Sequence, residues 1–140
     1  GMKDSAAVVV EAENYDKLTG TSRLTQGVTF MTGISQMNKA EDTAEYTVDI
    51  PESGYYDLGV RYAAWQEPWP TRFIEINGTI YRFTCTDTGG YAGNGESDFD
   101  VVRIKSHTYL EAGKHKFTVM GSAETNTYWN VDWFAFLKTE

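Results

Sequence analysis

The sequence has little cysteine and no long apolar run. Cys85 is the single cysteine among 140 residues, so no intrachain disulfide can form. This is typical of a cytosolic protein, or of a bacterial extracellular protein stabilised by other means. No stretch approaches the roughly 20 apolar residues of a membrane-spanning helix, and no signal peptide is present. We therefore expect no membrane insertion.

Basic residues are also scarce. Lys and Arg number 12 against 20 Asp and Glu, which gives a formal net charge of -8. Nucleic acids and anionic membrane surfaces are bound through basic patches, so we expect neither as a partner. His107 and His115 stand apart, without the spacing of a metal site or a neighbouring nucleophile. We expect both histidines at the surface.

Aromatic residues and glycine are abundant instead. The chain has 4 Trp, 9 Tyr, 7 Phe and 13 Gly, and its short alternating segments are separated by turn residues, which favours an all-β sandwich. The Asn77-Gly78 pair between two such segments predicts a tight hairpin. The length fits one domain. We assign residues 7–140 to this domain and residues 1–6 to a tail, whose Gly1-Met2 start is typical of the remnant of an expression tag.

The connections alternate between the two ends of the predicted sandwich, because each strand reverses the direction of the chain. Short turns fall at one end: 51–54, 77–78 and 111–114. Longer loops fall at the other end: 36–42, 63–71, 85–98 and 121–129. These longer loops hold five large rings: Trp65, Trp69, Tyr91, Tyr128 and Trp129. Loops on a rigid scaffold often carry function, so we expect a recognition surface at this end.

The last predicted strand, "TYWNVDWFAF" at residues 127–136, places an aspartate among aromatic residues. Strict alternation would put Trp129, Val131, Trp133 and Ala135 on one face, and Asn130, Asp132, Phe134 and Phe136 on the other. Both faces then carry apolar residues, which excludes an edge strand. Asp132 should therefore be at least half-buried, and a buried carboxylate needs a cation, hydrogen bonds or a metal ion.

Five motifs in sequence resemble carbohydrate-binding modules of the family 6 and family 35 type: "VEAENY", "AEYTVDIPESGYYDLGVRYA", "TGGY", "LEAGKHKFTV" and "NVDWFAF". The resemblance covers nearly the whole chain. It implies a jelly-roll β-sandwich of two antiparallel sheets, related to galactose-binding domains, that binds a polysaccharide or oligosaccharide. It also implies a structural calcium ion, a monomer, and a secreted or cell-surface bacterial protein in which the module accompanies a catalytic domain.

The resemblance further implies the ligands of the calcium ion. Glu11, Glu13 and Asp132 match the acidic positions that hold calcium in the family, with backbone carbonyls completing the shell. Three carboxylates suit an ion that takes six to eight oxygen ligands. The alternative is that the two glutamates are solvated and that Asp132 pairs with a nearby Lys or Arg.

The implied sugar site combines rings with planar polar groups, which complement the apolar faces and hydroxyl rim of a pyranose. The family pattern maps a stacking ring to Tyr91 and a hydrogen-bonding amide to Asn130. A second ring usually precedes the "EYTV" strand, but that position falls near Met37, where this sequence has no aromatic residue. We therefore expect Trp69 or Trp65 to supply the second ring, with Trp129 as a further contact. Pro68 and Pro70 restrict the backbone around Trp69, which favours Trp69 over Trp65.

Two other classes of function compete with sugar binding. Glu96, Asp98 and Asp100 could serve a glycosidase, which needs two carboxylates at a set separation; a solvated acidic loop explains them better, so we expect no enzyme. No glycine-rich loop opens a helix to bind phosphate. The main alternative is a protein-interaction or cell-surface adhesion module, because exposed tryptophans also serve protein partners.

Overall fold

The computed structural model describes residues 1–28, 31–65, 69–124 and 127–139. Its elements are short, as the spacing of the turn residues predicts. The strands are β1 (Val8–Glu11), β2 (Lys17–Thr19), β3 (Arg23–Val28), β4 (Met31–Gln36), β5 (Thr43–Ile50), β6 (Gly54–Ala63), β7 (Thr71–Ile76), β8 (Thr79–Thr84), β9 (Asp100–Leu110), β10 (Gly113–Met120) and β11 (Trp129–Lys138). Helix α1 spans Met2–Ser5, and the 3-10 turn η1 spans Gly95–Asp98.

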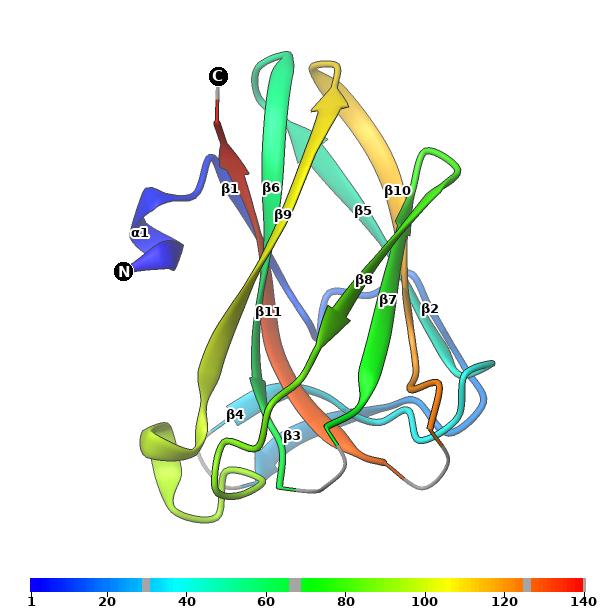
Figure 1. Ribbon diagram of the computed structural model, residues 1–140, viewed down its shortest axis with the longest axis vertical. Coiled ribbons are helices and arrows are strands. Elements are labelled where there is room, and N and C mark those ends of the chain that lie inside the picture. Colours follow the sequence, from blue (N-terminus) through cyan, green and yellow to red (C-terminus); the bar gives the residue numbers. More distant parts are fainter. Residues whose placement is uncertain (29–30, 66–68, 125–126, 140) are drawn as a thin grey trace.

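The described strands form two antiparallel sheets that face each other (Figure 1). The six-stranded sheet has the order β3-β4-β11-β6-β9, and β1 also pairs with β11. The five-stranded sheet has the order β2-β5-β10-β7-β8. The predicted jelly-roll β-sandwich is therefore confirmed. Strand β11 lies inside its sheet, as the apolar character of both its faces predicts.

The core between the sheets is rich in rings. Alternate residues of β5 point inward, and Tyr46 among them stacks on Phe117 of β10 with 5.1 Å between ring centroids. Phe134 and Phe136 of β11 close on Phe117 edge-on from the opposite sheet. The Tyr46 hydroxyl donates a 2.7 Å hydrogen bond to the carbonyl of Ala12, just after β1. Burial of these rings supplies much of the apolar contact that holds the two sheets together.

The predicted division of β11 into two faces is wrong beyond Asp132. Val131 pairs with Tyr62 of β6, and Trp133 pairs with the preceding residue of β6, Arg61, so Asp132 is an extra residue in a β-bulge. A bulge exchanges the faces of all later residues. As a result, Phe134 and Phe136 join Trp129 and Val131 in the core between the sheets. Trp133, Ala135 and Leu137 instead lie on the outer face of the six-stranded sheet.

Helix α1 covers this outer face. Met2 and Ala6 pack against the cluster formed by Trp133, Ala135 and Leu137, so part of the predicted tail is packed on the domain. Gly59 of β6 leaves space for Met2, because a Cβ added there would lie 2.2 Å from the methionine sulfur. Across the described residues, neither helix has the length or the apolar character to cross a membrane.

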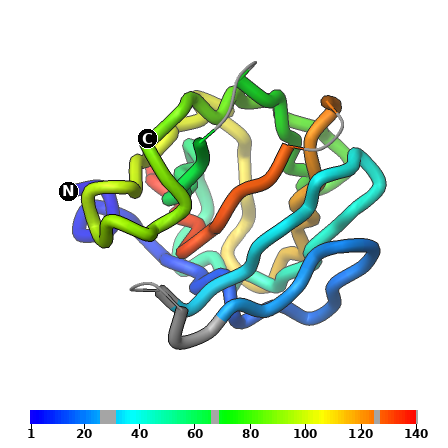
Figure 2. Tube along the Cα trace, turned by 90° about the horizontal axis from the view of Figure 1, so that it is seen from below, coloured from blue at the N-terminus to red at the C-terminus, as the bar shows by residue number. Residues whose placement is uncertain are grey.

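The connections separate by length as predicted. In Figure 1 the turns β5–β6, β7–β8 and β9–β10 lie at the upper end, and the longer loops lie at the lower end. We call these the turn end and the loop end. The hairpin at Asn77-Gly78 is confirmed, with φ of 51° and 81° at the two residues. Figure 2 looks onto the loop end, where β3 and β4 lie towards the viewer and β11 runs across the middle.

Candidate functional site

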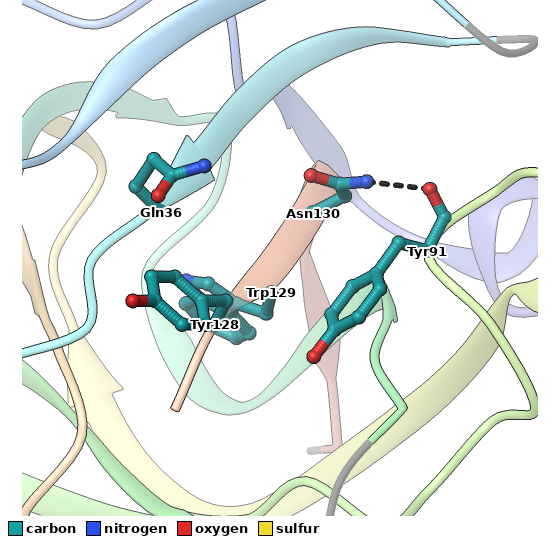
Figure 3. Close-up of a pocket in the computed structure, with 5 residues that line it drawn as sticks. All are labelled: Gln36, Tyr91, Tyr128, Trp129 and Asn130. Carbon is teal, nitrogen blue, oxygen red and sulfur yellow. Dashed lines mark hydrogen bonds between the residues drawn. The ribbon is translucent and has the colours of Figure 1, made fainter. Parts of the chain in front are cut away.

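A pocket of about 410 Å³ opens at the loop end (Figure 3). Three segments that are distant in sequence supply its lining: Gln36 at the end of β4, Tyr91 in the β8–β9 loop, and Tyr128, Trp129 and Asn130 at the start of β11. Figure 3 shows Tyr91 on one side of the pocket, with Tyr128 and Gln36 on the other. The volume falls within the range of small-molecule sites, roughly 300–1,000 Å³.

The backbone at the end of β4 is strained. Gln36 and Met37 have φ of 74° and 54°, a left-handed conformation that costs a non-glycine residue on the order of 1–2 kcal/mol. Gln36 nevertheless pairs with Trp129 in the sheet. The surrounding structure must therefore hold these two residues in place, and such strain tends to occur at functional sites.

Tyr91 is held at both its backbone and its hydroxyl. The Asn130 amide donates a 2.7 Å hydrogen bond to the Tyr91 carbonyl, and the Tyr91 hydroxyl donates a 3.1 Å bond to the carbonyl of Trp65. Partial burial raises the pKa of Tyr91, so the ring is neutral at physiological pH. Asn130 therefore fixes one wall of the pocket and also presents an amide to it.

Trp129 has a structural role as well as a place in the lining. Its side chain is fully buried, and the indole N–H points to the sulfur of Met37 at 3.4 Å. The guanidinium of Arg72 lies 4.2 Å from the centre of its ring on the inner side. Trp129 thus forms a fixed inner wall of the pocket rather than a flexible exposed ring.

The structure brings together three of the five residues predicted to bind sugar: Tyr91, Trp129 and Asn130 line the pocket. Trp65 and Trp69 lie at the same end but outside the lining, and they are 64% and 52% exposed. Pro68, expected to restrict the backbone beside Trp69, lies outside the described residues.

Two lining residues were not predicted: Gln36 and Tyr128. The sequence places Tyr128 among the rings of the loop end without marking it as a binding residue. Its position directly before Trp129 and Asn130 was the available sign. Met37, where the family usually has a ring, lies fully buried beside Trp129 and cannot face the pocket. The ring opposite Tyr91 is instead that of Tyr128 (Figure 3).

The residues predicted to bind calcium lie where β1 meets β11. The backbone N–H of Ala12 donates to the carbonyl of Asp132 at 2.9 Å. Asp132 accepts a 2.7 Å hydrogen bond from Arg61, and Glu11 accepts one of 2.9 Å from Lys3. Within the described residues, no group of three or more His, Cys, Asp or Glu side chains is arranged to hold a metal ion. The expected partial burial of Asp132 is confirmed, and its counter-charge in the structure is Arg61.

Glu13 differs from these two carboxylates. Its Oε1 atom is buried without a hydrogen-bond partner among the described residues. Burial raises the pKa of Glu13, and the nearby charges of Glu11 and Asp132 raise it further. Among the described residues, no lysine or arginine forms an ion pair with Glu13, so its carboxylate lacks a cation of its own.

The acidic loop considered for catalysis has structural contacts. Glu96 forms an ion pair with Arg61, and buried Asp98 accepts a 2.8 Å hydrogen bond from the backbone of Asn94. Asp100 is exposed at the start of β9. His107 is exposed and stacks on Tyr55, while His115 is partly buried. None of these residues lines the pocket.

No known protein-family profile matches the chain, and no curated protein matches it. Solved structures do match. A carbohydrate-binding module from a Cellvibrio mixtus lichenase, in complex with cellotriose, has a TM-score of 0.68 and 22% identity, covering 96% of this chain and 99% of that chain. The C-terminal family 6 module of a Zobellia galactanivorans laminarinase has a TM-score of 0.69 and 20% identity, covering 94% of this chain and 98% of that chain.

Larger enzymes match over a part of their length. The cycloalternan-forming enzyme of Listeria monocytogenes, in complex with a pentasaccharide substrate, has a TM-score of 0.73 and 23% identity, over 91% of this chain but 12% of the enzyme. At such identities, the likeness establishes a shared architecture. The chain therefore has the β-sandwich fold of carbohydrate-binding modules.

Proposed function

We propose that this domain is a non-catalytic carbohydrate-binding module and that the pocket at the loop end binds a glycan. The observation that carries the proposal is the pocket lining, in which the rings of Tyr91 and Tyr128, backed by the buried ring of Trp129, accompany the amides of Gln36 and Asn130. Rings pack against the C–H faces of a pyranose, and amides both donate to and accept from its hydroxyls. The full-length structural neighbours, one of them in complex with cellotriose, support this assignment.

The same lining argues against catalysis by this domain. None of the described residues that line the pocket is a carboxylic acid, whereas a glycosidase of the usual kind needs two carboxyl groups beside the scissile bond. We propose that the domain instead binds the glycan for a catalytic domain in the same secreted or cell-surface protein. The partial matches to longer enzymes, which include a Podospora anserina mannanase that carries a family 35 module, support this arrangement.

Titration calorimetry of the domain tests the proposal. The panel should include cellotriose, galactose and neutral oligosaccharides of other linkages, and Tyr91→Ala should be the matched variant. We expect at least one glycan to bind with modest affinity, because small ligands in open sites gain limited free energy per atom. Tyr91→Ala should weaken that binding. If no glycan binds at millimolar concentration, the alternative of a protein-interaction module, displaying exposed Trp65 and Trp69, would replace this proposal.

We also propose that calcium ties β1 to β11. Glu11, Glu13 and Asp132 would hold the ion together with backbone carbonyls, and the unpartnered buried oxygen of Glu13 supports the fit. Calcium would supply the counter-charge that Glu13 lacks, and Lys3 and Arg61 would release Glu11 and Asp132 to the ion. A cation bound only by the folded state stabilises that state by mass action.

Chelation tests the calcium proposal separately from sugar binding. Added calcium should raise the melting temperature of metal-free protein, EDTA should reverse the change, and Asp132→Ala should be insensitive to both. Glu45→Ala, which removes a partly buried carboxylate on β5, is the matched control and should keep the response. A melting temperature that does not respond to calcium would refute the proposal.

A further inference from the structure

Arg72 is a fully buried cation directly behind the pocket. It is the second residue of β7, with 0% of its surface exposed. Burial lowers the pKa of Arg72 to about 10, so the guanidinium stays charged at neutral pH. Among the described residues, Arg72 forms no ion pair. A buried charge without a counter-ion is costly, so its hydrogen bonds and ring contacts must offset that cost.

Its hydrogen bonds reach two different loops. One terminal nitrogen donates to the carbonyl of Met37 at 2.9 Å, and the other donates to the carbonyl of Thr127 at 3.0 Å. Met37 is one of the two strained residues at the end of β4 and directly follows Gln36. Thr127 directly precedes Tyr128. A single rigid fork thus joins the segments that supply four of the five lining residues,.

The third contact of Arg72 is with the pocket wall itself. The guanidinium carbon lies over the ring of Trp129, 4.2 Å from the ring centre, a distance typical of a cation–π contact. Arg72 is not part of the lining, so a ligand in the pocket does not meet the cation. Its influence on binding must pass through the residues that it holds.

We propose that Arg72 is the positioning residue of the pocket, because its guanidinium fixes the end of β4 and the start of β11 against each other and against Trp129. The expected effect of Arg72 on glycan affinity rests on the proposed function. The structural part of the inference concerns the two loops alone and can be tested without any ligand. An uncharged residue of similar volume would fill the same space but could not bridge the two carbonyls.

Hydrogen–deuterium exchange tests the structural part. Arg72→Met keeps the volume and removes the fork, and Arg72→Lys keeps the charge but cannot reproduce the two-pronged geometry. Ile76→Ala is the matched control, since Ile76 is a buried residue of the same strand and its apolar side chain cannot donate to either loop carbonyl. In both Arg72 variants, we expect faster exchange at residues 34–38 and 127–130, with protection retained in β5 and β10. Ile76→Ala should show no such local change.

Calorimetry at a temperature where all variants are folded tests the consequence. The probe is the member of the glycan panel that the unmodified protein binds most tightly. If the fork is lost and the competent loop arrangement falls to about a tenth of the molecules, affinity falls about tenfold. Ile76→Ala should retain full affinity. Faster exchange over the whole domain in the Arg72 variants would overturn the inference. Full glycan affinity in Arg72→Lys would overturn it as well.

The two proposals fail in different ways. If the unmodified protein binds no glycan of the panel, the proposed function fails, and the exchange data still decide whether Arg72 positions the loops. If the unmodified protein binds a glycan and Arg72→Lys binds it equally well, the positioning role fails while the proposed function stands.

Discussion

The two ends of the sandwich place backbone strain on different kinds of residue. At the turn end, positive φ angles fall on Asn77, Gly78 and Gly113, which adopt this conformation at little cost, and on His107 of β9, a residue type that adopts it more readily than most,. At the loop end, they also fall on Gln36, Met37 and Ala92, which do not. The turn end is thus specified locally by its residues, whereas the loop end depends on distant groups such as Arg72. Strain maintained from a distance is what distinguishes the candidate site from an ordinary set of loops.

The largest effect should come from Trp129, where the loop end and the core coincide. Trp129→Ala removes a fully buried ring and leaves a cavity beside Arg72, so we expect the free energy of unfolding to fall by about 3–5 kcal/mol. Urea denaturation followed by circular dichroism measures this change. A loss of glycan affinity without a loss of stability would show that the Trp129 ring contributes to binding but not to the core. The prediction would then be wrong.

The next effect concerns Tyr91, which is only partly buried. Tyr91→Ala should lower glycan affinity about tenfold, or ~1.4 kcal/mol, because the stacking surface is lost, and it should cost less stability than Trp129→Ala. Tyr91→Phe should keep most of the affinity, since the ring remains. Tyr109→Ala, which removes an exposed ring of β9 near the turn end, is the control in the same calorimetric titration and should leave affinity unchanged.

A smaller effect, on stability alone, is expected at the turn end. Gly78 has φ of 81° with open space around it, so Gly78→Ala meets no clash and only the conformational cost remains. We expect the free energy of unfolding to fall by about 1 kcal/mol, as measured by urea denaturation. Glycan affinity should be unaffected, and a change in affinity would contradict the independence of the two ends.

The smallest effect should belong to Trp69, which is 52% exposed and lies outside the pocket lining. If this ring contacts the part of a longer oligosaccharide that leaves the pocket, Trp69→Ala should weaken its binding a few-fold, by less than 1 kcal/mol. The melting temperature should not change, and Trp65→Ala should have a weaker effect. Loss of stability with unchanged binding would mean that the Trp69 ring is part of the core, and the prediction would be wrong.

Much of the fold follows from local patterns in the sequence. Alternation in β5 and the Asn77-Gly78 pair identify strands and turns that the structure confirms. The bulge at Asp132 could not be found in this way, because it depends on how β11 pairs with Arg61 and Tyr62 of another strand. A single unpaired residue was enough to move Trp133 and Phe134 to the faces opposite to those predicted.

The lining of the pocket was predictable where a family pattern marks its residues. Tyr91 and Asn130 were identified from a family pattern, and the structure joins them by a hydrogen bond. Gln36 carries no such mark, since its importance comes from a backbone angle that other segments impose. The position of Arg72 could not be predicted from the sequence either, because an arginine in a strand is ordinarily exposed. The structure shows its guanidinium against the ring of Trp129.

The central position of β11 has a consequence for how the domain folds during synthesis. Trp129–Lys138 is the last strand to be made, yet β1, β4 and β6 all pair with it. The larger sheet therefore cannot form completely until β11 has left the ribosome. Until then, the edges of β1, β4 and β6 that pair with β11 remain unpaired. Such non-local pairing slows folding and exposes aggregation-prone edges. Ribosome-bound chains that stop before residue 129 should bind chaperones, and chains extended far enough beyond residue 138 for β11 to leave the ribosome should release them.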